Sequence, residues 1–184
     1  MGGEGYGVGG EGYGVGGEGY GVGDERCGVG DTGFALPRGA TGFFVAKDGP
    51  LPEADPRAFR GALHAAARAA EGQVGEIEVQ EFPRTFHIAS VVDRTGETVV
   101  LCHAHHPWIA FARERRNWYA EGLFLDPPSW APVFEAAGFV VLSGERLATP
   151  LSGVDTSAFT RDEWRQVRTY GVTTLGGVLF NAWA

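Results

Sequence analysis

Two runs of largely apolar residues, 84–92 and 97–105, flank the turn residues Asp93-Arg94-Thr95-Gly96. In each run apolar side chains occupy both odd-numbered and even-numbered positions. Because successive side chains of a strand point to opposite faces, each strand would be apolar on both faces. Strands of this kind lie in the middle of a sheet that is covered on both sides. Gly96 supplies the positive φ that a tight turn needs. We therefore predict a central β-hairpin, and a turn symmetric about Arg94 and Thr95 places His87 opposite Cys102.

Four other segments have the composition of strands. Residues 76–82 place Ile77 and Val79 on one face and charged or polar residues on the other, which predicts a half-exposed edge strand. Residues 41–46 and 139–142 are aromatic and β-branched runs of the kind found in strands. Residues 108–111 are predicted either as a further strand or as the approach to a helix.

Helix signals separate these strands. Asp55 is a suitable N-cap, Pro56 a suitable first helical residue and Gly72 a suitable terminator, so we predict a helix between them. Similar signals predict three further helices, over residues 127–138, 160–170 and 175–183. The resulting element order excludes a regular βαβ array. We predict an α+β fold, with a mixed, mostly antiparallel sheet of about five strands covered by three to four helices.

A glycine-rich repeat precedes this domain. Residues 2–22 are three perfect copies of Gly-Gly-Glu-Gly-Tyr-Gly-Val. The four glycines of each unit oppose a helix by about 1 kcal/mol each, and the repeat offers little to bury. We predict a disordered low-complexity tail over residues 1–40 and a single globular domain over residues 41–184. The tail is open to three interpretations, as a solvated linker, a weakly self-associating segment or a stretch ahead of the true translation start.

Composition narrows the cellular setting. The net charge is −8, and Lys47 is the only lysine among 15 basic residues, a bias typical of a high-GC bacterial genome. An acidic domain lacks the basic footprint of nucleic-acid-binding proteins, and it is compatible with a basic protein partner. Two cysteines, no signal peptide and no long apolar run predict a cytoplasmic protein without membrane contact.

The densest chemistry lies in Cys102-His103-Ala104-His105-His106. On a strand, His103 and His105 point to one face about 7 Å apart, a spacing compatible with two ligands of one zinc ion. Cys102 and His106 point to the other face, where His87 joins Cys102 as a second half-site. Catalytic zinc needs three protein ligands, and neither half-site has an obvious third one. Two other interpretations of Cys102 are open. With His87 it could form a thiol nucleophile and its base, or it could be a small buried hydrophobic residue.

The only basic run is followed directly by aromatic residues. Its candidate contacts to a partner or a phosphate group are Arg113, Arg115, Arg116, Trp118 and Tyr119. The alternative is a solvated face that Trp118 anchors to the core.

Motifs of the common enzyme classes are missing. The chain has no Gly-x-Ser-x-Gly, no phosphate loop with lysine and no His-Glu-x-x-His. We therefore expect no catalytic residues and no cofactor. We interpret the chain as a small bacterial cytosolic protein of the accessory or immunity type, a non-enzymatic module that binds a protein partner. The alternative is a metal-dependent enzyme or metal-binding domain, with zinc as the expected ion, built on the cluster at residues 102–106.

Overall fold

The computed structural model describes residues 2, 34–43, 47 and 49–183. The chain divides into two units, Met1–Thr32 and Gly33–Ala184, and the fold below is that of the second unit. The disorder predicted for the repeats lies outside the described residues.

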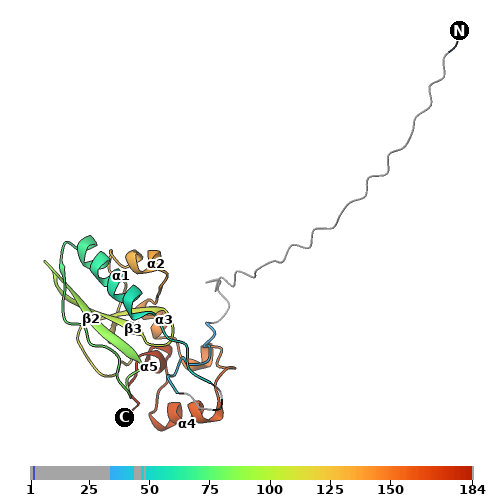
Figure 1. The fold of residues 1–184 in the computed structure, drawn as a ribbon. Coiled ribbons are helices and arrows are strands. Elements are labelled where there is room, and N and C mark those ends of the chain that lie inside the picture. The colour runs from blue at the N-terminus through green and yellow to red at the C-terminus, as the bar shows by residue number, and fades with distance from the viewer. Residues whose placement is uncertain (1, 3–33, 44–46, 48, 184) are drawn as a thin grey trace. The chain divides into compact units, whose positions relative to one another are not determined.

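An antiparallel hairpin forms the centre of the sheet, as predicted (Figure 1). β2 (Phe86–Asp93) pairs with β3 (Gly96–His103) along its whole length, and His87 lies opposite Cys102. The Asp93 carboxylate accepts hydrogen bonds from the backbone N–H and the hydroxyl of Thr95, both at 2.6 Å. These contacts within the turn fix the register that the turn residues predict.

Four shorter strands extend the hairpin into a mixed, mostly antiparallel sheet. β1 (Gln73–Val74) pairs with β2, and β4 (Trp108–Ala112) pairs with β3. Beyond β4 lie β5 (Phe124–Leu125), which is antiparallel to it, and β6 (Val140–Val141), which is parallel. The predicted α+β class is confirmed, with six strands and five α-helices in the part of the chain that the structure describes.

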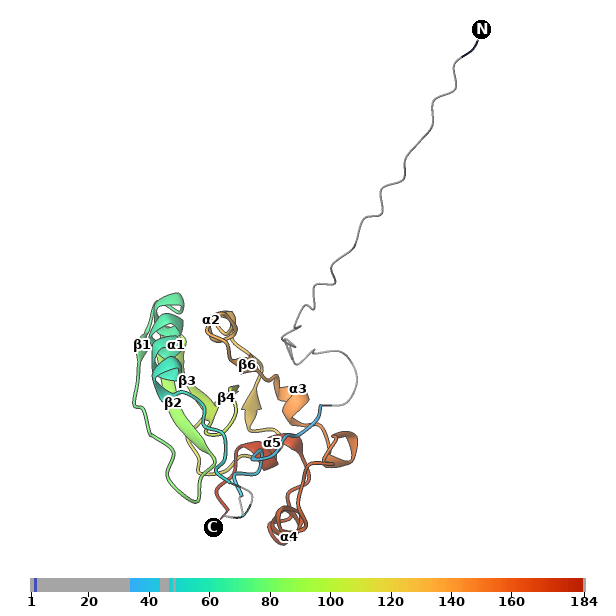
Figure 2. The ribbon, with the colours of Figure 1, turned by 45° about the vertical axis from the view of Figure 1, so that its right-hand side comes forward.

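Helices cover both faces of this sheet (Figures 1 and 2). α1 (Pro56–Ala69) and α2 (Pro132–Ala136) pack on one face of the sheet. They share a core with Cys102 and the other strand side chains that point to this face. α3 (Gly144–Leu147), α4 (Arg161–Thr169) and α5 (Leu175–Leu179) contribute to the core on the opposite face. The hairpin is apolar on both faces because each face buries a core of its own.

α1 begins where the sequence predicts and ends slightly earlier. The Asp55 side chain accepts the backbone N–H of Arg57 and caps the helix. At the other end Glu71, rather than Gly72, adopts the left-handed conformation, with φ of 52°. Gly72 is needed for space, because a Cβ there would lie 2.3 Å from the carbonyl oxygen of Val92.

α4 begins with a capping box formed by Thr160 and Glu163. The Thr160 hydroxyl accepts the backbone N–H of Glu163, and one carboxylate oxygen of Glu163 accepts the backbone N–H of Thr160. The other carboxylate oxygen accepts the hydroxyl of Thr41 at 2.5 Å, and both side chains are buried. The cap therefore also ties α4 to the N-terminal segment of the folded unit.

The folded unit begins before residue 41, where the sequence interpretation placed its boundary. Leu36 is 1 % exposed and Ala40 is buried, and the backbone N–H of Leu36 donates to the carbonyl of Asp155 at 2.8 Å. Thr41 and Gly42 lie in a turn, so they do not start the predicted strand, and residues 44–46 of that strand lie outside the described residues.

The edge strand predicted for residues 76–82 is reduced to one bridge between Glu78 and Ile88. Two residues further on, the N–H of Gln80 donates to Nδ1 of His87 instead of to the backbone of β2. The regular ladder ends there because a side chain has taken the place of a backbone acceptor.

Candidate functional site

The histidine cluster lies at the C-terminal end of β3. His103 is the last residue of that strand, and His105 and His106 lie in the turn that leads to β4. Each ring has one nitrogen within 3.0 Å of a backbone carbonyl oxygen: His103 Nε2 on Ala40, His105 Nδ1 on Pro52 and His106 Nε2 on Arg38. The three rings therefore hold the segment that precedes α1 against the end of the sheet.

His103 is fully buried, and its contacts select the neutral ring. Nδ1 accepts the backbone N–H groups of His105 and His106, at 3.1 and 3.2 Å, so the proton lies on Nε2 and is donated to the carbonyl of Ala40. Burial lowers the pKa of His103 well below its usual value, because a charged ring would be removed from water there. His103 is thus a neutral structural group of the fold.

The predicted zinc ligands are close together but already engaged. The ring centroid of His103 lies 5.8 Å from that of His105 and 5.6 Å from that of His106. Within the described residues, no three His, Cys, Asp or Glu side chains are grouped so that they could hold a metal ion. A zinc ion bound through the ring nitrogens that hold the carbonyls would displace those contacts, so zinc binding stays a prediction.

Cys102 and His87 are cross-strand neighbours, as predicted, but their surroundings do not activate a thiol. Cys102 is fully buried, and burial raises the pKa of its thiol. His87 accepts the N–H of Gln80 at Nδ1, at 2.9 Å. The pKa of His87 is lowered by burial and then by the charge of Arg84. The environment favours the interpretation of Cys102 as a small hydrophobe in the core beneath α1.

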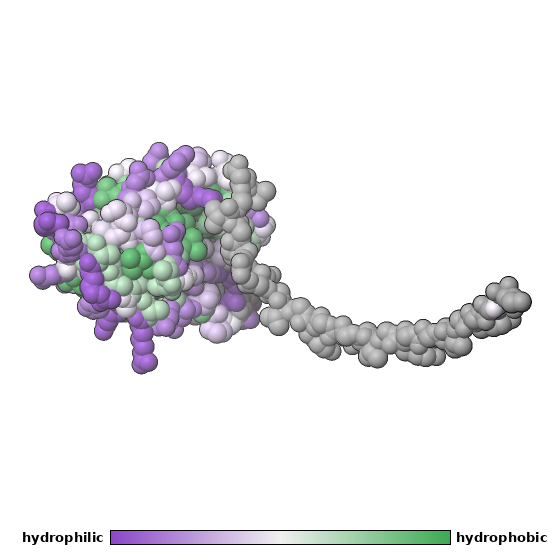
Figure 3. Space-filling view, turned by 90° about the horizontal axis from the view of Figure 1, so that it is seen from above, coloured by the Kyte–Doolittle hydropathy of each residue, from purple (hydrophilic) through white to green (hydrophobic). Residues whose placement is uncertain are grey.

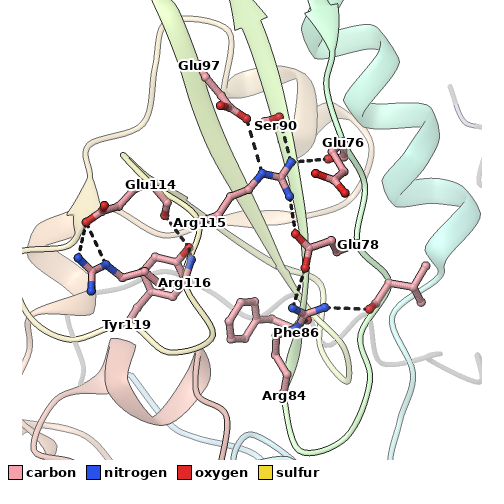
Figure 4. A network of polar contacts seen from close by, with 11 residues as sticks. Glu76, Glu78, Arg84, Phe86, Ser90, Glu97, Glu114, Arg115, Arg116 and Tyr119 are labelled. Atoms are coloured by element: carbon pink, nitrogen blue, oxygen red, sulfur yellow. Dashed lines mark hydrogen bonds and ion pairs between the residues drawn. The ribbon is translucent and has the colours of Figure 1, made fainter.

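The basic run contains one arginine with a purely internal role. Arg115 extends over the sheet and forms an ion pair with Glu78 at 2.8 Å (Figure 4). It also donates to the carbonyl of Glu76 and the hydroxyl of Ser90, at 2.6 and 3.1 Å, and lies 3.6 Å from Glu97. These contacts attach residues 113–119 to the hairpin.

Glu78 joins this contact to a second arginine. Its other carboxylate oxygen lies 3.0 Å from Arg84 Nη1. Burial by itself would raise the pKa of Glu78, but the hydrogen bonds from Arg84 and Arg115 outweigh it and lower the pKa. Sequence reasoning missed the role of Glu78 and Arg84, because alternation along residues 76–80 indicated only a solvent-facing charge.

Tyr119 is buried and fixes the same loop from its other end. Its hydroxyl donates to the carbonyl of Glu114 at 2.8 Å and accepts the backbone N–H of Arg116 at 2.9 Å. Its ring packs edge-on against Phe86, with centroids 5.7 Å apart. The predicted contact residues therefore divide: Arg115 and Tyr119 point inward, while Arg113, Arg116 and Trp118 are exposed.

Other exposed apolar side chains were not among the predicted contacts. Phe82 is 87 % exposed, and the nearby Val79 is exposed as well. The sequence signal that could have identified Phe82 is its position in a Phe-Pro pair directly after an acidic segment. The sequence analysis assigned both Phe82 and Val79 to an edge strand.

Comparison with family models, curated proteins and solved structures finds no match to this chain. Among the described residues, none of the helices has the length and apolar character needed to span a membrane. The functional argument therefore rests on the contacts described above.

Proposed function

We propose that this chain is a non-enzymatic protein-binding module of the accessory or immunity type, which uses residues 113–119, the Trp118 loop, as its contact surface. The observation that carries the proposal is the indole of Trp118, which is 52 % exposed on a loop that Arg115 and Tyr119 bind to the fold. Tryptophan and arginine are enriched among the residues that contribute most to protein–protein affinity. Arg113 and Arg116 lie exposed within five residues of this indole.

The Trp118 loop is organised before any partner binds. Arg115 attaches it to Glu78 and Ser90, and the buried Tyr119 binds the backbone at Glu114 and Arg116. Binding to a preorganised loop loses less conformational entropy than binding to a flexible one. The two inward-pointing residues thus support the presentation of the outward-pointing ones.

The partner we propose offers an apolar pocket for the indole and carries net positive charge that lies away from this pocket, because the Trp118 loop itself exposes Arg113 and Arg116. The chain has a net charge of −8, so long-range attraction favours encounter with a basic protein. Short-range specificity would come from the indole, because a buried aromatic contact contributes more than a charge at the rim of an interface.

Affinity capture from the native host tests the proposal, with the full-length chain and two variants as baits. We expect the unmodified chain and Tyr170→Ala to retain the same partner in equal amount. Trp118→Ala should weaken its binding by about 30-fold, the effect of losing a central tryptophan contact. Tyr170 is a matched control because it is also an aromatic residue, 41 % exposed.

Melting temperatures of the three baits show whether the variants are folded, and titration of the purified partner measures the affinities. Equal affinity of the unmodified chain and Trp118→Ala would contradict the proposal. Capture of no protein in stoichiometric amount would contradict it as well.

The metal-binding alternative makes a separate prediction. It requires about one equivalent of zinc in protein purified without an affinity tag, and loss of thermal stability when a chelator removes the metal. In the structure the neutral His103 ring is engaged at both nitrogens, and this favours the protein-binding function.

A further inference from the structure

The outer face of α1 carries only basic long side chains. Phe59, Leu63 and Ala66 point from the helix into the core. On the opposite face the exposed long side chains are those of Arg57, Arg60, His64 and Arg68. Successive residues of an α-helix are about 100° apart, so these four side chains fall within about a quarter of the helix circumference. We call them the arginine face.

No acidic residue interrupts the arginine face. Between Asp55 and Glu71 the sequence contains none, although the chain as a whole has a net charge of −8. Asp55 is engaged as the N-cap of α1, and Glu71 forms an ion pair with Arg94. None of the three arginines of this face forms an ion pair with a described residue. The positive charge of α1 is therefore concentrated on one exposed stripe.

The surface between these side chains is hollowed. Gly61 lies on the same side of the helix, and a Cβ there would have no atom within 4 Å. With Pro56, Arg57, Arg60 and His64 it lines a depression of ≈ 410 Å³. Gly61 has no side chain, so a partner's chain can approach the helix closely at that position. The view from above shows a face on which hydrophilic side chains project between paler and hydrophobic residues (Figure 3).

We infer that the arginine face binds an acidic segment of a protein, whose carboxylates pair with Arg57, Arg60 and Arg68. Guanidinium groups suit this role because their donors match the two oxygens of a carboxylate. From Arg57 to Arg68 the stripe is about 16 Å long, enough for three turns of helix or about five extended residues of a partner.

The ends of the stripe favour a short acidic peptide over a nucleic acid. Glu53 and Asp55 lie before the first turn, and Glu71 lies after the last. A nucleic-acid backbone that continued past either end would meet these carboxylates, whereas a short acidic segment can end between them. The arginine face and the Trp118 loop are separate surfaces. The charge of the arginine face is positive, whereas the net charge of the whole chain is negative.

Fluorescence anisotropy with a labelled octaglutamate peptide tests the inference on the full-length chain at low salt. We expect saturable binding that weakens with salt, because salt screens the exposed charges. The double variant R57Q/R60Q should bind about tenfold more weakly. R161Q/R165Q is the control for net charge, since it removes two exposed arginines from α4, one of which, Arg165, forms an ion pair with Asp162. It should bind within about twofold of the unmodified chain.

Three results would overturn the inference: no peptide binding, equal losses in the two double variants, or tighter binding of an eight-residue oligothymidylate than of the peptide. Trp118→Ala separates the inference from the proposed function. It should bind octaglutamate as the unmodified chain does, and an equal loss in Trp118→Ala and R57Q/R60Q would contradict a separate site.

Discussion

His103 shows how a residue that resembles a metal ligand can have a structural role. Its ring accepts two N–H groups and donates to one carbonyl, and only the neutral imidazole can satisfy all three contacts. His87 and His106 also have lowered pKa values, first of all because burial, which is partial for His106, disfavours the charged ring. The sequence shows that four histidines lie near one end of the hairpin, but it cannot show that the segment before α1 covers them.

These histidines make stability depend on pH. Their pKa values are lowered in the folded state, so below about pH 6.5 the unfolded chain binds more protons than the folded one. The free energy of unfolding should therefore be highest above this pH and fall as the solution is acidified. Urea titrations at pH 8, 7, 6 and 5 measure this decline. His106→Asn should make it shallower, and a stability that is constant or rises from pH 8 to pH 5 would refute the expectation.

Arg115 and Arg113 are indistinguishable in sequence and differ in the structure. Arg115 contacts Glu78, Glu76 and Ser90, whereas Arg113 is exposed. Arg115→Met should lower the free energy of unfolding by about 1–3 kcal/mol, since it leaves partly buried acceptors without a donor. Arg113→Met should change it by less than about 0.5 kcal/mol. Denaturant unfolding of both variants measures the contrast, and equal effects would show that the Arg115 contacts do not stabilise the fold.

At the scale of elements, the signals that succeeded were local. The hairpin register followed from four turn residues, the start of α1 from Asp55 and Pro56, and the start of α4 from a capping box. The two-residue strands β1 and β5 and the four-residue α3 were missed. Such short elements are defined by their partners in the sheet and core, and a stretch of two to four residues is too short to show a periodic pattern.

Glycines in two helices are expected to respond oppositely to alanine. Gly61 in α1 faces open space, so Gly61→Ala should stabilise the protein by about 0.5–1 kcal/mol through helix propensity. In α5, a Cβ at Gly176 would lie 2.4 Å from the ring of Phe124 and 3.1 Å from Leu147. Gly176→Ala should therefore destabilise the protein by about 1–3 kcal/mol. Thermal melts give both signs, and stabilisation by Gly176→Ala would contradict the packing described for α5.

At the scale of the whole molecule, the class of fold was predictable and the start of the folded unit was not. A sheet with two apolar faces requires helices on both sides, and the sequence shows enough helix signals to supply them. The burial of Leu36 is a long-range event, because its backbone partner is Asp155. Glycines on either side of Leu36 resemble the repeats, so composition assigned it to the tail.

Truncation tests where the folded unit begins. A chain of residues 34–184 keeps Leu36 and the carbonyls of Arg38 and Ala40, and should melt within about 2 °C of the full-length chain. A chain of residues 41–184 loses the buried Leu36 and leaves the Nε2 proton of His103 without its acceptor. The loss of apolar burial and the unpaired buried donor together should lower the free energy of unfolding by about 3–6 kcal/mol. The melting temperature should therefore fall by more than about 10 °C.

Leu36→Ala within residues 34–184 separates the two contributions, because it removes the apolar side chain and keeps the carbonyls that His103 and His106 bind. We expect it to melt between the two truncated chains. If residues 41–184 melted with the full-length chain, then Leu36 and the histidine contacts would contribute nothing to stability, and the pH dependence argued from the same rings would lose its structural basis.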